Sequence, residues 1–149
     1  MFTNKSIIEI ILTLLVFLFL YTGLSKYFDI YHFKTALVDA PLLKPFANVI
    51  AILLPGLEIV VVILLTIPAT RIIGLWLSIV LLSIFSLYLT YMVSFSKILP
   101  CGCGGVISQL SWKGHILFNL FFLSISIIAL RLENKKHRRE QSSRYMASV

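Results

Sequence analysis

Long apolar runs alternate with short polar stretches along the whole chain. Four runs, at about 6–25, 46–67, 72–96 and 112–130, are almost wholly apolar. A helix needs roughly 20 such residues to cross the hydrocarbon core of a bilayer. Backbone polar groups in lipid must be satisfied within their own segment, which favours helices, and the alternation typical of strands is absent. The pattern predicts an all-α integral membrane four-helix bundle, with residues 1–131 forming one domain.

The composition points to the same class. Hydrophobic residues make up 59% of the 149 residues, only 13% are charged, and the mean hydropathy is +0.99. Soluble globular domains are about 45–50% apolar, so this composition excludes a soluble globular domain. Between the first two runs, Phe28, Tyr31, His32 and Leu37 are spaced as on a short amphipathic helix at the membrane interface.

Basic residues predict the orientation of the bundle. Segment 132–149 is expected to be a basic cytoplasmic tail, partly disordered, because Lys and Arg near helix ends favour the cytoplasmic side. With four spans the N-terminus lies on that side too. We therefore expect a multi-pass cytoplasmic (inner) membrane protein with both termini in the cytoplasm. The net charge of +7 indicates contact with anionic membrane lipid and not with nucleic acid, because no nucleic-acid-binding motif accompanies it.

The two cysteines of the chain, Cys101 and Cys103, lie in the loop between the third and fourth runs, which this orientation places outside the cytoplasm. Disulfides persist in such compartments. A bond across one residue closes almost no chain and so gains little as a structural staple. Strained or exposed disulfides are the labile and catalytic ones, so the pair is predicted to be catalytic in redox exchange. Two alternatives stay open: small apolar fillers, and metal ligands together with His115.

Four further polar residues are candidates for supporting roles. Glu58 falls near the middle of the second run, where acids are rare and usually functional. We expect its partner to be Asn119 or a hydroxyl of the third run. His115 and Asn119 share one face of the fourth helix, toward the cysteine loop. Lys26 ends the first run and is expected to reach the outer interface.

These residues fall within short motifs: "TGLSK" closes the first run, "LLPGLE" lies in the second, and "CGCGG" precedes "SWKGHILFN". The combination resembles the MauE (methylamine utilisation) family of DoxX-like membrane proteins over nearly the whole chain. The resemblance implies a four-helix membrane protein linked to thiol redox. It also implies maturation of a disulfide-rich methylamine dehydrogenase subunit beside a thioredoxin-like partner. Cys101 and Cys103 match the redox pair, and Lys26 and Glu58 match polar family marks.

The leading hypothesis is a membrane thiol–disulfide oxidoreductase or electron-transfer protein. It would serve a thioredoxin-fold protein outside the cytoplasm through a mixed disulfide. One cysteine pair cannot form an internal thiol relay, so electrons pass to another protein or to a membrane quinone, the candidate cofactor. The groove between the third and fourth spans is its expected place. The rival hypotheses are a non-catalytic scaffold subunit that docks a partner protein, and a Cys/His metal-handling protein.

Overall fold

The structure is a computed structural model that describes residues 4–40, 43–95 and 112–147. The described residues form helices and no strands, in the order α1 (Asn4–Phe28), α2 (Ile30–Asp39), the 3-10 turn η1 (Lys44–Phe46), α3 (Ala47–Thr66), α4 (Arg71–Phe95) and α5 (Trp112–Ala147). Four of them, α1, α3, α4 and α5, are long and apolar enough to cross a membrane. The predicted all-α class with four spans is confirmed.

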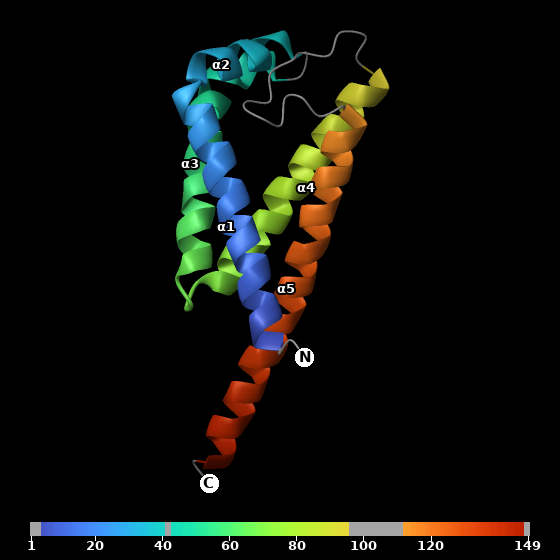
Figure 1. The fold of residues 1–149 in the computed structure, drawn as a ribbon. Helices are drawn as coiled ribbons and strands as arrows, with labels where there is room; N and C mark the ends of the chain where they lie inside the picture. The colour runs from blue at the N-terminus through green and yellow to red at the C-terminus, as the bar shows by residue number, and fades with distance from the viewer. Residues whose placement is uncertain (1–3, 41–42, 96–111, 148–149) are drawn as a thin grey trace.

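The four long helices run up and down as a bundle (Figure 1). Helices α1 and α4 each pack against α3 and α5, so neighbouring helices are antiparallel. At one end, here called the α2 end, α1 and α4 finish, α3 and α5 begin, and α2 lies across α3. At the other end, the tail end, α1 begins, α3 turns into α4, and α5 leaves the bundle.

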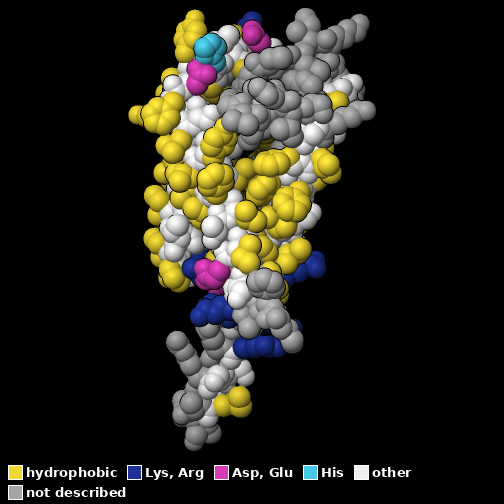
Figure 2. Space-filling model, in the orientation of Figure 1, with side chains coloured by type: hydrophobic (Ala, Val, Ile, Leu, Met, Phe, Trp, Pro, Cys, Tyr) yellow, Lys and Arg dark blue, Asp and Glu magenta, His cyan; other side chains and the backbone are white. Residues whose placement is uncertain are grey.

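On the face that Figure 2 shows, apolar side chains cover the bundle between its two ends. Phe17, Ile52, Leu87 and Leu117, one from each long helix, are about 70% exposed. A water-soluble fold would not expose large side chains on every helix, whereas lipid tails are as apolar as these residues. Charged side chains gather at the ends. The protein is therefore a multi-pass membrane protein.

Apolar side chains fill the inside of the bundle toward the tail end. There Leu15, Leu65, Leu75 and Ala129 are at most 1% exposed and belong to one apolar cluster. Gly74 lets α4 approach the end of α3, because a Cβ at this position would lie 3.0 Å from the backbone nitrogen of Leu65. A second, small cluster joins α2 to the start of α3 through Phe33, Leu37, Ala47 and Ala51.

Helix α5 is longer than the predicted span. The fourth span is predicted to end at residue 130, and in the structure the same helix continues through the basic segment to Ala147. The physical reason is that no Gly or Pro follows Gly114, and the tail is rich in Lys, Arg, Glu and Gln, which are good helix formers. Glu133 and Lys136 add an i,i+3 ion pair of 3.3 Å.

Candidate functional site

A buried ion pair joins α1 to α3 in the α2 half of the bundle. The Nζ atom of Lys26 lies 2.7 Å from Oε1 of Glu58, and the two side chains are only 12% and 10% exposed. The Oγ1 atom of Thr22 donates to the same carboxylate oxygen over 3.2 Å. Lys26 also donates to the backbone oxygen of Thr22 at 3.4 Å and lies 5.9 Å from the centre of the Phe33 ring on α2. Helix α2 thus covers the ammonium group.

The ion pair depends on a close approach of the two helices at Gly23. A Cβ on Gly23 would lie 3.3 Å from Cβ of Glu58 and 3.5 Å from its Oε2 atom. The residues Thr22 and Lys26 are spaced i,i+4, so both face α3 from the same side of α1. Glycine between them therefore leaves the room in which the Glu58 carboxylate lies.

The carboxylate of Glu58 is only half satisfied. Its Oε1 atom receives both hydrogen bonds from α1, whereas Oε2 is buried and has no hydrogen-bond partner in the part of the chain that the structure describes. Buried polar atoms normally have a partner, because an unpaired one costs about 1–3 kcal/mol. An unpaired carboxylate oxygen inside a membrane bundle is a feature that a ligand or water could explain.

Helix α5 contributes a second polar pair opposite the first. His115 and Asn119 are spaced i,i+4 on one face and are 8% and 6% exposed. The Nδ2 atom of Asn119 is buried and, among the described residues, finds no acceptor. The site therefore holds an unpaired donor on α5 as well as an unpaired acceptor on α3.

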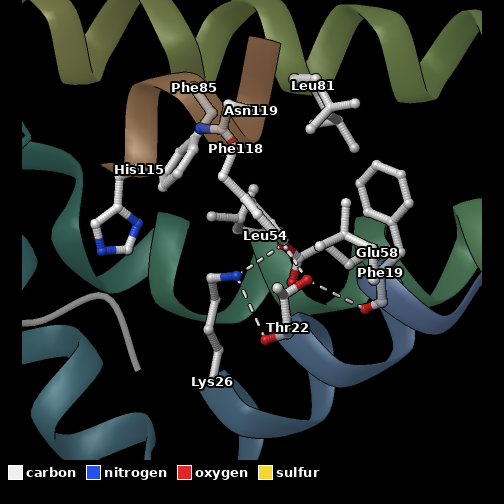
Figure 3. Close-up of a pocket in the computed structure, with 12 residues that line it drawn as sticks. Phe19, Thr22, Lys26, Leu54, Glu58, Leu81, Phe85, His115, Phe118 and Asn119 are labelled. Atoms are coloured by element: carbon white, nitrogen blue, oxygen red, sulfur yellow. Dashed lines mark hydrogen bonds and ion pairs between the residues drawn. The ribbon is translucent and has the colours of Figure 1, made fainter. Parts of the chain in front are cut away.

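The two polar pairs line one cavity of about 90 Å³ (Figure 3). Thr22 contributes to its wall as well, and the rest is apolar: Leu18, Phe19, Leu54, Leu81, Leu82, Phe85 and Phe118. The lining comes from α1, α3, α4 and α5, so the cavity lies inside the bundle and not in a groove between two helices. A largely apolar cavity with a few convergent polar groups is the usual form of a small-molecule site.

The structure brings together Lys26, Glu58, His115 and Asn119, all four of the supporting residues named from the sequence. The predicted partner of Glu58 was wrong: it is Lys26 with Thr22, from the first helix. The reason is that Lys26 turns inward to a carboxylate, which lowers the cost of burying both charges, and does not extend to the interface. The catalytic candidates Cys101 and Cys103 lie outside the described residues.

Sequence reasoning missed Thr22 and Gly23. The signal was present in "TGLSK", where a hydroxyl and an ammonium flank a glycine at helical spacing.

The serines of the bundle, in contrast, mostly bond within their own helices. Ser86 donates to the backbone oxygen of Leu82, and Ser126 to that of Phe122. Among the described residues, no group of three or more His, Cys, Asp or Glu could hold a metal ion.

Fold and site together define a multi-pass helical membrane protein with a buried ion pair beside an internal polar cavity. Residues 4–132 match the family model of the methylamine utilisation protein MauE, and the chain belongs to this family. No curated protein and no solved structure matches the chain.

Proposed function

We propose that this protein is a thiol–disulfide oxidoreductase of the cytoplasmic membrane. Cys101 and Cys103 form its redox pair on the non-cytoplasmic side. Its partner is a thioredoxin-fold protein outside the cytoplasm, which acts in the maturation of extracytoplasmic proteins. The family described as methylamine utilisation protein MauE is consistent with one such pathway, but the proposed chemistry does not depend on methylamine.

One structural observation carries the proposal. Helices α4 and α5, which flank the cysteine segment in sequence, end and begin at the α2 end of the bundle (Figure 1). His115, near the start of α5, already lines the polar cavity. The basic extension of α5 leaves from the opposite end. Positive charge favours the cytoplasmic side, which supports a non-cytoplasmic position for the α2 end.

The proposed exchange conserves electrons. A thiolate of one protein attacks the disulfide of the other, so one S–S bond breaks as the mixed S–S bond forms. The second thiolate of the attacking protein then breaks the mixed disulfide and leaves its partner reduced. Nearby positive charge or hydrogen-bond donors favour the thiolate, and Lys26 and His115 are groups of this kind in the α2 half.

The test is a pair of cysteine variants. In Cys103→Ser the remaining thiol cannot resolve the mixed disulfide, so we expect a partner protein to be trapped on Cys101, and the reverse in Cys101→Ser. Partner oxidation should fall to background while the abundance of the membrane protein is unchanged. Ser124→Ala, on the exposed face of α5, is the matched control.

Two results would contradict this function. One is partner oxidation that persists in both cysteine variants, or that falls only in proportion to protein abundance, as a docking scaffold requires. The other is labelling of the reduced cysteines in intact cells only by a membrane-permeant reagent, because this would place the pair in the reducing compartment.

A further inference from the structure

The cavity combines apolar walls with two residues, Glu58 and Asn119, that each hold a buried polar atom without a hydrogen-bond partner among the described residues. Phe19, Phe85 and Phe118 supply aromatic faces to the wall. In the described part of the chain, the Nδ2 donor of Asn119 lacks an acceptor, and the Oε2 acceptor of Glu58 lacks a donor. Both residues are more than nine-tenths buried. A ligand that satisfies them needs a flat apolar body and oxygen atoms that can both accept and donate hydrogen bonds.

We infer that this cavity binds the ring of a membrane quinone. The carbonyl oxygens of the oxidised ring are acceptors, which suit the Asn119 amide and the ammonium of Lys26. The hydroxyls of the reduced ring are donors, which suit the unpaired Oε2 atom of Glu58. The polar wall therefore matches both oxidation states of one ligand, and the phenyl rings match its flat face.

The position of the cavity agrees with this ligand, but its size requires the wall to move. A volume of about 90 Å³ is smaller than the cavity of ~150 Å³ that holds benzene in another protein, so the ring enters as the wall widens. The cavity is not sealed, so the substituents and the isoprenoid tail can extend outside it. Lys26 is a flexible side chain at the wall, and its movement can widen the space.

The inference rests on the proposed function for its redox role. When Cys101 and Cys103 are oxidised, two S–H bonds break, one S–S bond forms, and the sulfurs lose two electrons. The ring takes up these two electrons and two protons, and its two carbonyls become hydroxyls. The net reaction is dithiol plus quinone to disulfide plus quinol, which balances without another oxidant. Electrons then flow from the thioredoxin-fold partner into the membrane.

Quinone binding can be measured on the full-length protein in lipid nanodiscs. Decylubiquinone and menadione are the probes, and empty nanodiscs correct for partition into lipid. We expect saturable binding near one quinone per chain. Asn119→Leu removes the donor but keeps the number and branching of the side-chain heavy atoms, and should weaken binding about tenfold, the loss of roughly one hydrogen bond. Asn134→Leu, on the exposed tail part of α5, is the matched control and should bind like wild type.

A photoreactive azidoquinone on the wild-type protein gives an independent measurement. We expect the label on residues that line the cavity, and excess quinone should prevent it. Binding no greater than in empty nanodiscs, or a label confined to the outer faces of the helices, would overturn the inference and leave water as the occupant of the cavity.

The cysteine variant separates this inference from the proposed function. Cys101→Ser/Cys103→Ser should bind quinone like wild type, because the groups proposed to hold the ring, on Lys26, Glu58 and Asn119, are unchanged. Saturable binding without any thiol cycling would remove the proposed function and leave the quinone site in place. Thiol cycling with the partner but no quinone binding would remove the quinone site and leave the function.

Discussion

The two halves of the bundle handle polar groups in opposite ways. In the tail half, Ser78 and Ser126 are fully buried, and each donates to a carbonyl one turn earlier in its own helix. In the α2 half, Lys26 and Glu58 form their ion pair between helices, and Nδ2 of Asn119 has no partner among the described residues. The tail half has an interhelical ion pair too, Arg71 with Glu9, but it lies at the end of the bundle, where the Glu9 side chain is 48% exposed. The tail half thus keeps its serine hydrogen bonds within single helices and its ion pair at the end, whereas the α2 half holds an ion pair and a cavity at its centre.

This contrast indicates where stability has been given up for a site. Buried ions inside a membrane bundle are costly, and unpaired polar atoms add to the cost. A cavity also forfeits the dispersion contacts that its lining would make if it were filled. Natural proteins accept such costs mainly where a ligand or a reaction needs them. The α2 half is therefore the half to test for function, and the tail half serves as an internal reference.

The largest expected effect comes from removing one charge of the ion pair. Lys26→Met leaves the Glu58 carboxylate buried without its cation and should lower the free energy of unfolding by about 3–5 kcal/mol. The double variant Lys26→Met/Glu58→Leu removes both charges and should recover most of this loss. Denaturant unfolding in mixed micelles measures both changes. Lys34→Met, on the exposed face of α2, is the control. A single variant as stable as wild type would show that the pair contributes nothing.

Replacing each of three glycines with alanine should change the free energy of unfolding by smaller, graded amounts. In Gly74→Ala, the added Cβ would lie 3.0 Å from the backbone of α3. The backbone must then shift, so the free energy of unfolding should fall by about 2–3 kcal/mol. In Gly23→Ala, the added Cβ would lie 3.3 Å from the Glu58 side chain, so the free energy of unfolding should fall by about 1 kcal/mol. In Gly56→Ala, the added Cβ has no neighbour within 4 Å. The free energy of unfolding should therefore rise by up to about 1 kcal/mol, because alanine has a higher helix propensity than glycine. The same unfolding assay ranks them, and any other order would contradict the helix contacts described here.

The smallest effects compare one polar residue from each half. Asn119→Leu replaces an unpaired buried amide with an apolar side chain and should raise the free energy of unfolding by about 1 kcal/mol. Ser126→Ala removes only a hydrogen bond within its own helix and should change the free energy of unfolding by less than about 0.5 kcal/mol. Thermal unfolding in nanodiscs without added quinone measures both. Destabilisation by Asn119→Leu would mean that the amide is already paired, and the α2 half would then resemble the tail half.

The spans could be predicted because the bilayer imposes a length on each apolar run. The predicted runs agree with α1, α3 and α4 to within a few residues. The interfacial helix was also anticipated, although Phe28 belongs to α1 and Leu37 is buried, while Tyr31 and His32 are exposed. The end of α5 was harder to predict, because charge marks the end of a span but not the end of a helix.

The site could be predicted only in part. Glu58, His115 and Asn119 stand out because polar residues are rare in apolar runs, so their importance is visible in the sequence. Their partners are not visible, because each helix can rotate about its axis without changing its pattern. The choice of Lys26 over Asn119 as the partner of Glu58 depends on which faces meet, and Gly23 influences this through the close approach of α1 and α3.

The sequence by itself determined the class of the protein, the number of its spans and the short list of polar residues, because each follows from the composition of a local segment facing lipid. Only the tertiary structure decided that Lys26 and Glu58 form an ion pair, that Nδ2 of Asn119 has no partner among the described residues, and that the three residues line one cavity. These features depend on distances of a few ångströms between helices far apart in the chain, and such distances are set by how side chains pack between them.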